Sequence, residues 1–231
     1  MDKKIKLSVV MPTMNEEKAI AKVISDIQKY SAPYDLELLI VDSSVDKTPE
    51  IAESMGARVI KQPPQGPGKA LILGIQNSTG QVVITSDCDD TYPMEDIPRF
   101  INYWENGYHF INGSRMNPSN ISMPKFNRFG NWVFAFLVRN LYKIQTSDIT
   151  TGMRLFSRQL IDSHKWETNY SFWAEILIKS HQNGFKYIEI PIKYRLRLGE
   201  VKLNVWRSGI AFIKCIFKYR FNLSFIDPKK L

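Results

Sequence analysis

The chain has 231 residues, a formal net charge of +8 at pH 7 and an ordinary hydrophobic content of 44%. This length fits one large domain, and the longest uncharged apolar stretch, Phe129 to Val138, is about half of the roughly 20 residues that a membrane span needs. Cys88 and Cys215 lie far apart and no signal peptide is visible, so we expect no disulfide framework and a reducing, cytoplasmic location.

The excess positive charge lies at the end of the chain. From Lys193 onward there are ten basic and two acidic residues, whereas the preceding 192 residues hold 21 of each. Such a block favours phosphate ligands, which could belong to lipid headgroups, a phosphorylated substrate or nucleic acid.

The first half of the chain alternates apolar strands with helices. Asn15 is predicted to cap the first helix, with Glu16 and Glu17 in its first turn. Thr48 is predicted to cap the second helix, which stops at Gly56. The expected strands are Leu7–Met11, Leu36–Val41, Arg58–Lys61 and Val82–Ile84. This alternation predicts an α/β fold with a mostly parallel sheet that helices cover on both faces.

The second half is less regular. We expect strands at Tyr108–Asn112, Leu155–Phe156 and Tyr187–Tyr194, and helices at Asn127–Ile144, Phe172–Asn183 and Trp206–Phe221. Because there is no internal repeat or low-complexity linker, we divide the chain only into a main domain, residues 1–204, and a basic amphipathic segment, residues 205–231.

Three carboxylates directly follow the last strand of the first half. Asp87, Asp89 and Asp90 repel one another, so we expect positive groups among them. Hard oxygen ligands of this kind suit Mg²⁺ or Mn²⁺, which proteins usually share with substrate phosphates. The alternative interpretation is a solvated acidic turn that caps the next helix.

Ligands of parallel α/β sheets bind beyond the carboxyl ends of the strands. Four predicted loops reach that edge, and they contain Pro12–Glu17, Asp42, Lys69 and Asp87–Asp90. Their shared position predicts a single binding site. The spacing of the glycines before Lys69 does not match a P-loop. The alternative to a ligand-binding role is that Lys69 only caps a helix.

Seven motifs follow one another along the chain. They are Val10–Glu17, Val41–Thr48, Gly66–Leu71, Asp87–Asp90, Gly113–Arg115, Thr151–Arg154 and Tyr194–Glu200. In this order they resemble the family 2 glycosyltransferases of the GT-A fold, and among these the polyprenyl-phosphate sugar transferases of the dolichol-phosphate mannosyltransferase type. The resemblance covers the chain from about Leu7 to Asn204.

The resemblance implies three groups of site residues. The nucleotide-sugar pocket would contain Pro12, Met14, Glu16, Asp42, Lys69 and Asp87. The metal would be held by Asp87 and Asp89. The acceptor phosphate would face Arg115, Arg128, Arg154 and Arg197. Of these residues, Asp87, Asp89, Arg115 and Arg128 would be the catalytic ones.

The chain also departs from the family pattern. Thr91 stands where a Gln often completes the metal site, which leaves the third ligand open. The acidic run at Asp42 is one residue shorter than usual. We also expect no counterpart of the family's membrane-spanning tail.

We therefore expect an inverting, metal-dependent transfer of a sugar from a GDP- or UDP-sugar to a polyprenyl phosphate, dolichyl or undecaprenyl, at the cytoplasmic face of a membrane. A lipid monophosphate has a second pKa of about 6, so near neutral pH it needs cations to position it and no general base. The alternative acceptor is a sugar hydroxyl of a growing glycan, which would require a base, and Glu175 is the candidate.

The distribution of charged and aromatic residues also bears on the partners. The acidic loops would repel a phosphate backbone, so we do not expect nucleic acid as a partner. The expected partners are an anionic membrane surface and a membrane protein. Arg154 could be a structural arginine that binds carbonyl groups. Trp132, Phe134 and Phe136 are expected in the core, with a lipid-facing role as the alternative.

The last predicted helix has two distinct faces. Its apolar face would contain Trp206, Ile210, Ile213 and Phe217, and a separate basic stripe Arg207, Lys214 and Lys218. Arg220 falls near the apolar side, where its long stem could snorkel. Either this helix packs on the main domain, or it lies on an anionic membrane surface.

Overall fold

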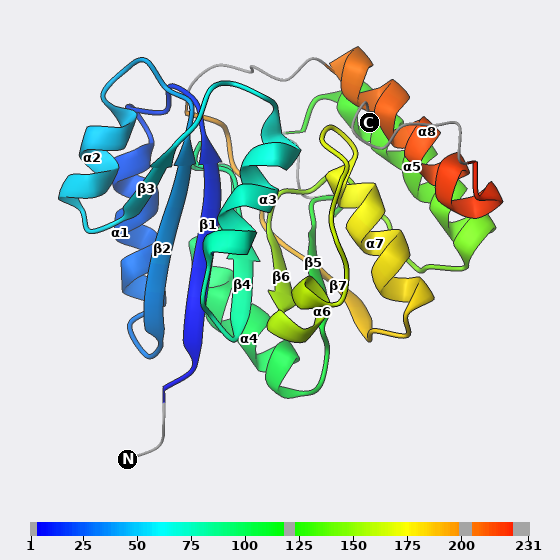
Figure 1. Ribbon diagram of the computed structural model, residues 1–231, viewed down its shortest axis with the longest axis horizontal. Coiled ribbons are helices and arrows are strands. Elements are labelled where there is room, and N and C mark those ends of the chain that lie inside the picture. Colours follow the sequence, from blue (N-terminus) through cyan, green and yellow to red (C-terminus); the bar gives the residue numbers. More distant parts are fainter. Residues whose placement is uncertain (1–3, 118–122, 199–204, 224–231) are drawn as a thin grey trace.

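The computed structural model describes residues 4–117, 123–198 and 205–223, which form one seven-stranded sheet with helices on both faces (Figure 1). The strands are β1 (Lys6–Thr13), β2 (Asp35–Asp42), β3 (Arg58–Lys61), β4 (Val82–Thr85), β5 (Phe110–Ser114), β6 (Arg154–Ser157) and β7 (Tyr187–Pro191). The helices are α1 (Ile20–Tyr30), α2 (Thr48–Ser54), α3 (Pro67–Asn77), α4 (Ile97–Glu105), α5 (Lys125–Tyr142), α6 (Arg158–Asp162), α7 (Phe172–Gln182) and α8 (Val205–Phe221), with a 3₁₀ turn, η1, at Met94–Asp96.

The strand order β3-β2-β1-β4-β6-β5-β7 brings the predicted loops to one edge of the sheet. All neighbouring strands are parallel except β6, which runs antiparallel to β4 and β5. The start of β6 at Arg154 therefore lies at the same edge as the ends of the other strands, for example Thr13 and Asp42, which pair in register. The predicted α/β class and the shared edge are confirmed.

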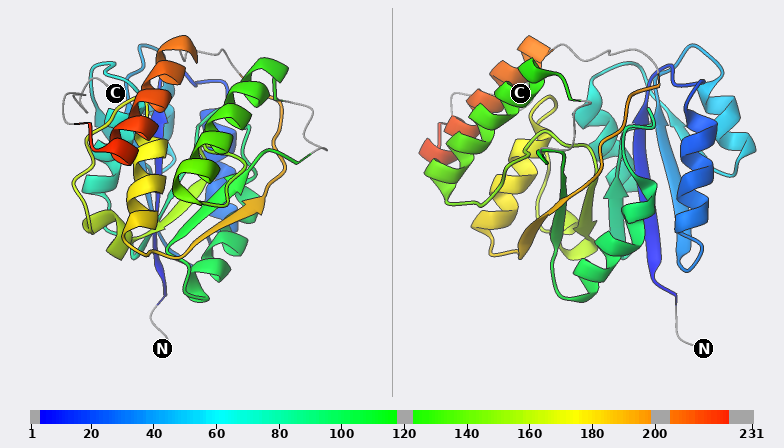
Figure 2. Two further views of the ribbon diagram at one scale, coloured as in Figure 1. Left: turned by 90° about the vertical axis from the view of Figure 1, so that its right-hand side faces the viewer. Right: turned by 180° about the vertical axis from the view of Figure 1, so that it is seen from behind.

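Alternating side chains of the strands enter two separate hydrophobic cores. In β1, Leu7, Val9 and Met11 face one core with α1 and α4, whereas Val10 faces the other with α3. This alternation follows from the two-residue period of a strand. Figure 2 shows the two helical layers on opposite faces of the sheet.

Helices α5 and α8 form a further layer beyond α7 (Figures 1 and 2). The Tyr142 hydroxyl of α5 donates to the carbonyl of Ile216 (2.5 Å), and Phe134 stacks on Phe212 with ring centroids 5.2 Å apart. The Tyr219 hydroxyl donates to Glu175 Oε1 of α7 (2.9 Å). Helix α8 thus packs on the rest of the protein.

The predicted apolar face of α8 is not the face that it buries. The buried residues are Ala211, Phe212, Cys215 and Ile216, together with Ser208. Trp206, Ile210 and Ile213 lie on the exposed side. Among the described residues, none of the helices combines the length and the hydrophobicity that crossing a bilayer requires.

The prediction that Asn15 caps the first helix was wrong. Helix α1 begins at Ile20, and Asn15 adopts a left-handed conformation with a φ of 54°. Its side-chain oxygen accepts a hydrogen bond from the backbone N–H of Val45 (2.9 Å), and so it joins the loops after β1 and β2. Glu16 and Glu17 accordingly precede the helix. The expected boundary at residue 204 lies outside the described residues.

Candidate active site

The turn after β4 carries the two aspartates that were predicted to hold a metal. Asp89 is 1% exposed, and its Oδ1 accepts hydrogen bonds from the backbone N–H of Thr91 (3.1 Å) and from Thr91 Oγ1 (2.5 Å). The Asp87 carboxylate packs against Gly152, where an added Cβ atom would lie 2.9 Å from Asp87 Oδ1. A side chain at position 152 would displace this carboxylate, so the geometry requires glycine there.

Cationic side chains lie among these carboxylates, as predicted. Arg197 donates from Nε to Asp89 Oδ2 (2.6 Å), and its terminal nitrogen contacts the same oxygen. Asp90 pairs with Lys22 of α1 at 2.6 Å and with Arg195 at 3.5 Å. Because Asp89 is buried and both Asp89 and Asp90 are paired with cations, the alternative of a solvated acidic turn does not describe this site.

The surroundings of Asp87 disfavour its charged form. Burial and the neighbouring Asp89 carboxylate raise the pKa of Asp87 to about 7. The positive charges of Arg197 and Arg115 oppose this rise only in part, and the carboxylate of Glu16 adds to it. An additional cation at this position would be electrostatically favourable.

The segment after β7 brings Arg197 to the acidic turn. The backbone N–H of Arg195 donates to the carbonyl of Thr91 (2.8 Å), and that of Leu198 donates to the carbonyl of Asp89 (3.0 Å). These two bonds hold the segment across the turn with Arg197 between them. We call residues 192–198 the strap.

Asp42 ends β2 beside the end of β1, at the place predicted for the nucleotide. Its Oδ1 accepts hydrogen bonds from Thr13 Oγ1 (2.8 Å) and Ser44 Oγ (2.6 Å). Asp42 lines a cavity of about 320 Å³ with residues 43–45 and 61–64, and this volume falls within the range of small-molecule pockets.

The other residues predicted for the nucleotide pocket lie at the same edge. Pro12 pairs in register with Val41 at the end of β2, and Met14, which follows β1, is 37% exposed. Glu16 is buried, and its backbone N–H donates to Thr48 Oγ1 (2.8 Å). The structure therefore brings these parts of the predicted pocket together.

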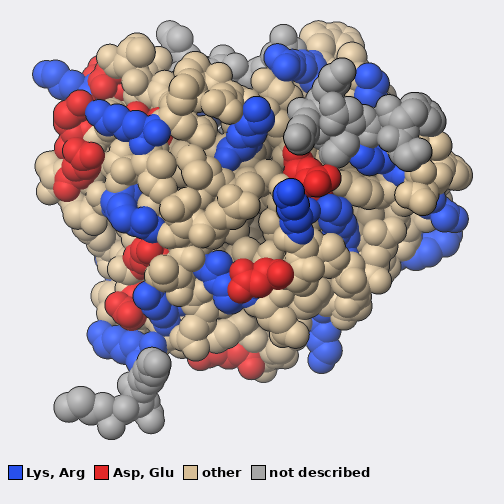
Figure 3. Space-filling model, in the orientation of Figure 1, with Lys and Arg blue, Asp and Glu red and all other residues tan. Residues whose placement is uncertain are grey.

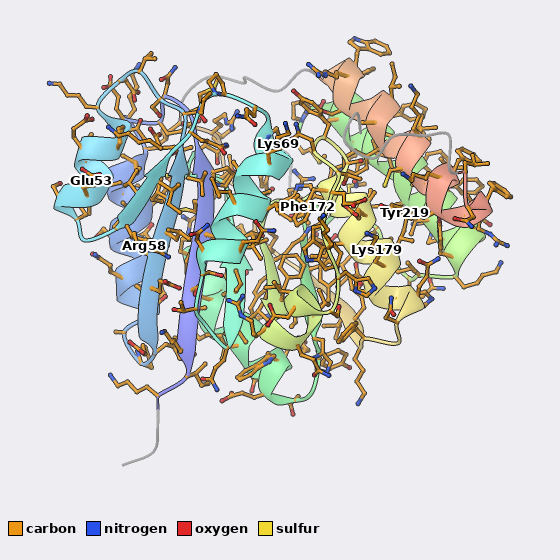
Figure 4. The ribbon with its side chains drawn as sticks, in the orientation of Figure 1. Glu53, Arg58, Lys69, Phe172, Lys179 and Tyr219 are labelled. Atoms are coloured by element: carbon orange, nitrogen blue, oxygen red, sulfur yellow. The ribbon has the colours of Figure 1, made fainter. Side chains whose placement is uncertain are left out.

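Lys69 is exposed at the first turn of α3, at the upper end of that helix in Figure 4. Its backbone N–H donates to Asn169 Oδ1 (3.2 Å), and its Nζ donates to Gln65 Oε1 (3.3 Å). Asn169 also donates from Nδ2 to the carbonyl of Gln65 (2.6 Å), and Gly68 touches its backbone so closely that a Cβ atom would not fit. Asn169 therefore fixes the loop that presents Lys69.

Arg115, at the end of β5, is held by Asp148. The guanidinium donates from Nε to Asp148 Oδ2 and from its terminal nitrogen to Oδ1, both at 2.8 Å, and it also donates to Thr150 Oγ1 (2.7 Å). Burial alone would raise the pKa of Asp148, but the charge and hydrogen bonds of Arg115 lower it. Removing one partner of such a buried pair costs about 3–5 kcal/mol, so Arg115 has a structural role whatever else it binds.

Arg128, in the first turns of α5, is more accessible than Arg115. Its terminal nitrogen donates to the carbonyl of Asn117, in the chain that follows β5, at 2.9 Å. This contact places the guanidinium on the β5 side of the candidate site. Arg128 is therefore better suited than Arg115 to test acceptor binding by mutation.

The structure corrects the prediction that Arg154 faces the acceptor phosphate. Arg154 is 0% exposed, and its guanidinium donates to the carbonyls of Ile149 (2.7 Å), Thr151 (3.1 Å) and Trp173 (3.3 Å). The guanidinium also lies 4.3 Å from the Trp173 ring centroid. These contacts support the structural alternative, in which Arg154 organises the turn before β6.

Glu175, the candidate base for a hydroxyl acceptor, is also buried in a structural network. Its carboxylate accepts hydrogen bonds from Lys179 (2.6 Å), Thr168 (2.8 Å) and Tyr219 (2.9 Å), and Figure 4 shows Lys179 and Tyr219 close together. Burial alone would raise its pKa, but the contacts with Lys179 and Thr168 lower it. An enclosed carboxylate with a lowered pKa is a poor general base.

Asp87 and Asp89 fit a shared divalent-cation site. They offer hard carboxylate oxygens, buried in Asp89 and partly exposed in Asp87, which is the donor type that Mg²⁺ and Mn²⁺ prefer. Within residues 4–117, 123–198 and 205–223, no three His, Cys, Asp or Glu side chains cluster to hold a metal alone. A cation here would take its remaining ligands from water and from substrate phosphates.

Sequence reasoning missed two residues that position the site. Asp148 is not among the predicted site residues, because its pairing with Arg115 depends on a contact across 33 residues. No sequence signal marks Asn169, which holds a loop about a hundred residues earlier in the chain. Gly199 and Glu200, the last residues of the seventh motif, lie outside the described residues.

Sequence comparison identifies clear relatives. The model of the family described as Glycosyl transferase family 2 matches residues 8–164. A dolichyl-phosphate hexose transferase of Haloferax volcanii is 44% identical over 212 residues, which are 92% of this chain and 92% of that protein. The low-salt glycan biosynthesis hexosyltransferase Agl6 of the same organism is 33% identical over 90% of this chain and 52% of its own length.

Solved structures share the fold. Glucosyl-3-phosphoglycerate synthase of Mycobacterium tuberculosis, in complex with Mn²⁺, UDP and phosphoglyceric acid, has a TM-score of 0.75 and 20% identity, covering 94% of this chain and 78% of its own. Mannosyl-3-phosphoglycerate synthase of Rubrobacter xylanophilus has a TM-score of 0.76 and 16% identity, covering 97% and 78%. These matches confirm the GT-A architecture that was predicted.

The pairing of Arg197 with Asp89 leads to a first prediction. If a divalent cation uses Asp89, it competes with Arg197, so Arg197→Met should tighten Mn²⁺ binding about tenfold in the absence of nucleotide. Free Mn²⁺ can be titrated against the protein by electron paramagnetic resonance.

Arg195→Met provides the matched control, because Arg195 lies on the same strap but pairs with Asp90 and Glu95. Its Mn²⁺ affinity should change less than that of the Arg197 variant. Weaker or unchanged Mn²⁺ binding in Arg197→Met would show that the cation does not use Asp89.

Proposed function

Because the chain belongs to glycosyl transferase family 2, we propose that it transfers a hexose from a nucleotide sugar to dolichyl phosphate or a related polyprenyl phosphate. The observation that carries this proposal is the 44% identity to a dolichyl-phosphate hexose transferase over 92% of both chains. Identity that is both this high and this complete argues for a shared reaction class as well as a shared fold. The protein is thus a nucleotide-sugar-dependent hexosyltransferase.

The donor occupies the half of the sheet edge formed by β1, β2 and α3. The cavity lined by Asp42 with residues 43–45 and 61–64 accepts the nucleoside, GDP- or UDP-linked. The segment with Pro12, Met14 and Glu16, at the end of β1, lies beside the end of β2. Lys69 lies at the start of α3, and both its charge and the positive end of the helix dipole favour an anionic diphosphate nearby.

Asp87 and Asp89 are the residues that would hold Mg²⁺ or Mn²⁺, and the donor diphosphate would share the ion. When bound, the ion neutralises the charge that develops on the departing nucleoside diphosphate. The protein's own contribution is to orient the two carboxylates, and a bound cation would favour the ionised form of Asp87, whose pKa burial and Asp89 raise to about 7. Thr91 fixes Asp89, and Gly152 leaves room for Asp87.

The acceptor phosphate approaches from the side of β5, α5 and the strap. Arg128 and Arg197 supply accessible positive charge there, and Arg115 supplies charge from behind, oriented by Asp148. A lipid phosphate is already a dianion near neutral pH, so these cations need only orient its oxygen toward the sugar. Attack from the face opposite the leaving group gives inversion at the sugar carbon.

Transfer to a sugar hydroxyl is less well supported. That reaction needs a general base, and the base nominated for it, Glu175, is enclosed by Lys179, Thr168 and Tyr219. A lipid-phosphate acceptor also explains the location that we propose, which is peripheral to the cytoplasmic face of a membrane. An anionic membrane surface and a membrane-protein partner are compatible with the basic charge of α8.

Transfer can be tested with radiolabelled GDP- and UDP-hexoses, polyprenyl phosphate and Mn²⁺. The label should pass into the organic phase. Both Asp89→Ala and chelation of the metal should reduce the rate of transfer at least a hundredfold, because the charge on the leaving group is then not stabilised. Asp162→Ala, which removes a 61% exposed carboxylate from α6, is the control and should be fully active. Label that stays in the aqueous phase with every donor, or full activity of Asp89→Ala, would refute the assignment.

Acceptor binding can be tested at Arg128. Arg128→Ala should raise the KM for polyprenyl phosphate about tenfold or more, because a charge-assisted hydrogen bond is worth roughly 1.5–3 kcal/mol. The Kd for the nucleoside diphosphate, measured by calorimetry, should not change. Lys125→Ala removes an exposed charge three residues away on α5 and should have a smaller effect on KM. Equal losses of nucleotide and acceptor binding in Arg128→Ala would assign this arginine to the donor.

A further inference from the structure

Helix α5 presents a row of aromatic side chains to solvent. Phe129, Trp132 and Phe136 are 63%, 49% and 47% exposed. Spaced by three and four residues, they lie on one side of the helix and stack in succession, with ring centroids 6.1 Å and 5.7 Å apart. The sequence prediction placed Trp132 and Phe136 in the core, but only Phe134 of that group packs inward, against Phe212.

The exposed side of α8 continues this surface. Trp206, Ile210 and Ile213 are 74%, 54% and 40% exposed. The Trp206 ring lies 5.7 Å from that of Phe126, which is 56% exposed at the start of α5. We call the combined surface the apolar ridge, and its residues are Phe126, Phe129, Trp132, Phe136, Trp206, Ile210 and Ile213. Exposed apolar surface of this extent on neighbouring helices marks an interaction site.

The ridge lies in a strongly basic setting. Neither α5 nor α8 contains an Asp or Glu, and the basic residues of the two helices are Lys125, Arg128, Arg139, Arg207, Lys214, Lys218 and Arg220. In Figure 3 the charged side chains along the right-hand margin, where these helices lie, are Lys and Arg. Aromatic residues flanked by basic ones suit the boundary between lipid headgroups and acyl chains.

The ridge is also joined directly to the acceptor side of the candidate site. Asn131, next to Trp132 but buried, accepts hydrogen bonds from the backbone N–H of Thr150 (3.1 Å) and from Thr150 Oγ1 (3.0 Å). Thr150 Oγ1 in turn accepts a hydrogen bond from Arg115. Helix α5 is therefore connected to Arg115 through the hydrogen bonds of Asn131 and Thr150.

We propose that the apolar ridge inserts into the interface of an anionic lipid bilayer and delivers the acceptor arginines to the phosphates of that surface. The choice of a bilayer as the occupant rests on the proposed function, because a polyprenyl phosphate is itself embedded in lipid. Charge supports the same choice. Two copies of this chain that met through the ridge would oppose two basic surfaces, whereas anionic headgroups neutralise them.

The proposal differs from the sequence prediction in where the contact lies. The sequence analysis placed the membrane contact on the last helix and gave Trp132, Phe134 and Phe136 a lipid-facing role only as the alternative. In this proposal α5 is an equal part of the surface. The deciding variants are therefore in α5. Phe129→Glu and Trp132→Glu alter residues that are 63% and 49% exposed and belong to neither the donor nor the acceptor site proposed above.

The test is co-sedimentation of the full chain with phosphatidylglycerol–phosphatidylcholine vesicles and with phosphatidylcholine vesicles alone. The wild-type protein should bind the anionic vesicles, less strongly as salt rises, and each α5 variant should lose at least tenfold in partitioning. Ser25→Glu adds the same charge to an exposed position of α1, in the helical layer on the opposite face of the sheet, and should bind as wild type. Equal binding by wild-type protein and both α5 variants would overturn the proposal.

Two further measurements separate this inference from the proposed function. Transfer to a short-chain, water-soluble prenyl phosphate should be unchanged in Phe129→Glu, while transfer to a long-chain acceptor in vesicles falls. Vesicle binding that depends on the ridge without transfer to either acceptor would refute the lipid-phosphate reaction and support the ridge. Sedimentation velocity tests whether the ridge instead binds a second copy of the chain. A wild-type dimer that dissociates in Phe129→Glu would overturn the proposal that the ridge binds a bilayer.

Discussion

The site depends on two carboxylates held close together in a shielded place. Asp87 and Asp89 follow a fully buried strand, and burial together with their proximity raises the pKa of Asp87 to about 7 even with Arg197 and Arg115 nearby. Such a pair is stable only when positive charge is close. In this structure Arg197 neutralises Asp89, and in the proposed reaction a divalent cation that is shared with the donor diphosphate would take over that task.

The surrounding structure keeps the positive charges in position. The strap is fixed by backbone hydrogen bonds to Thr91 and Asp89, so Arg197 is placed by main-chain geometry. Arg115 is fixed by Asp148. The residue before Asp148, Ser147, is held in turn by Glu189, because its backbone N–H donates to the Glu189 carboxylate (2.9 Å). These contacts join β5, β7 and the turn before β6 into one support, and Asn131 attaches α5 to it.

The sequence predicted the parts of the site that follow strands. The α/β class, the shared edge and the need for cations near Asp87–Asp90 all follow from local patterns, because a strand's end fixes where the next residues lie. The sequence could not predict contacts between residues that lie far apart along the chain. The assignment of Arg154 failed because an arginine in a polar turn looks the same whether it binds a phosphate or three carbonyl groups. The face of α8 was misjudged because burial of Ala211 and Cys215 depends on where α5 and α7 lie, which no helical period reveals.

The central claim is that the cation-bound donor takes the place of Arg197 on Asp89. A crystal structure of the protein with Mn²⁺ and UDP or GDP tests this most directly. The account predicts Mn²⁺ bound to the carboxylates of Asp87 and Asp89 and to the diphosphate, with the Arg197 guanidinium moved away from Asp89 Oδ2. A structure in which the nucleotide is bound while Arg197 still pairs with Asp89 and the metal lies elsewhere would contradict it.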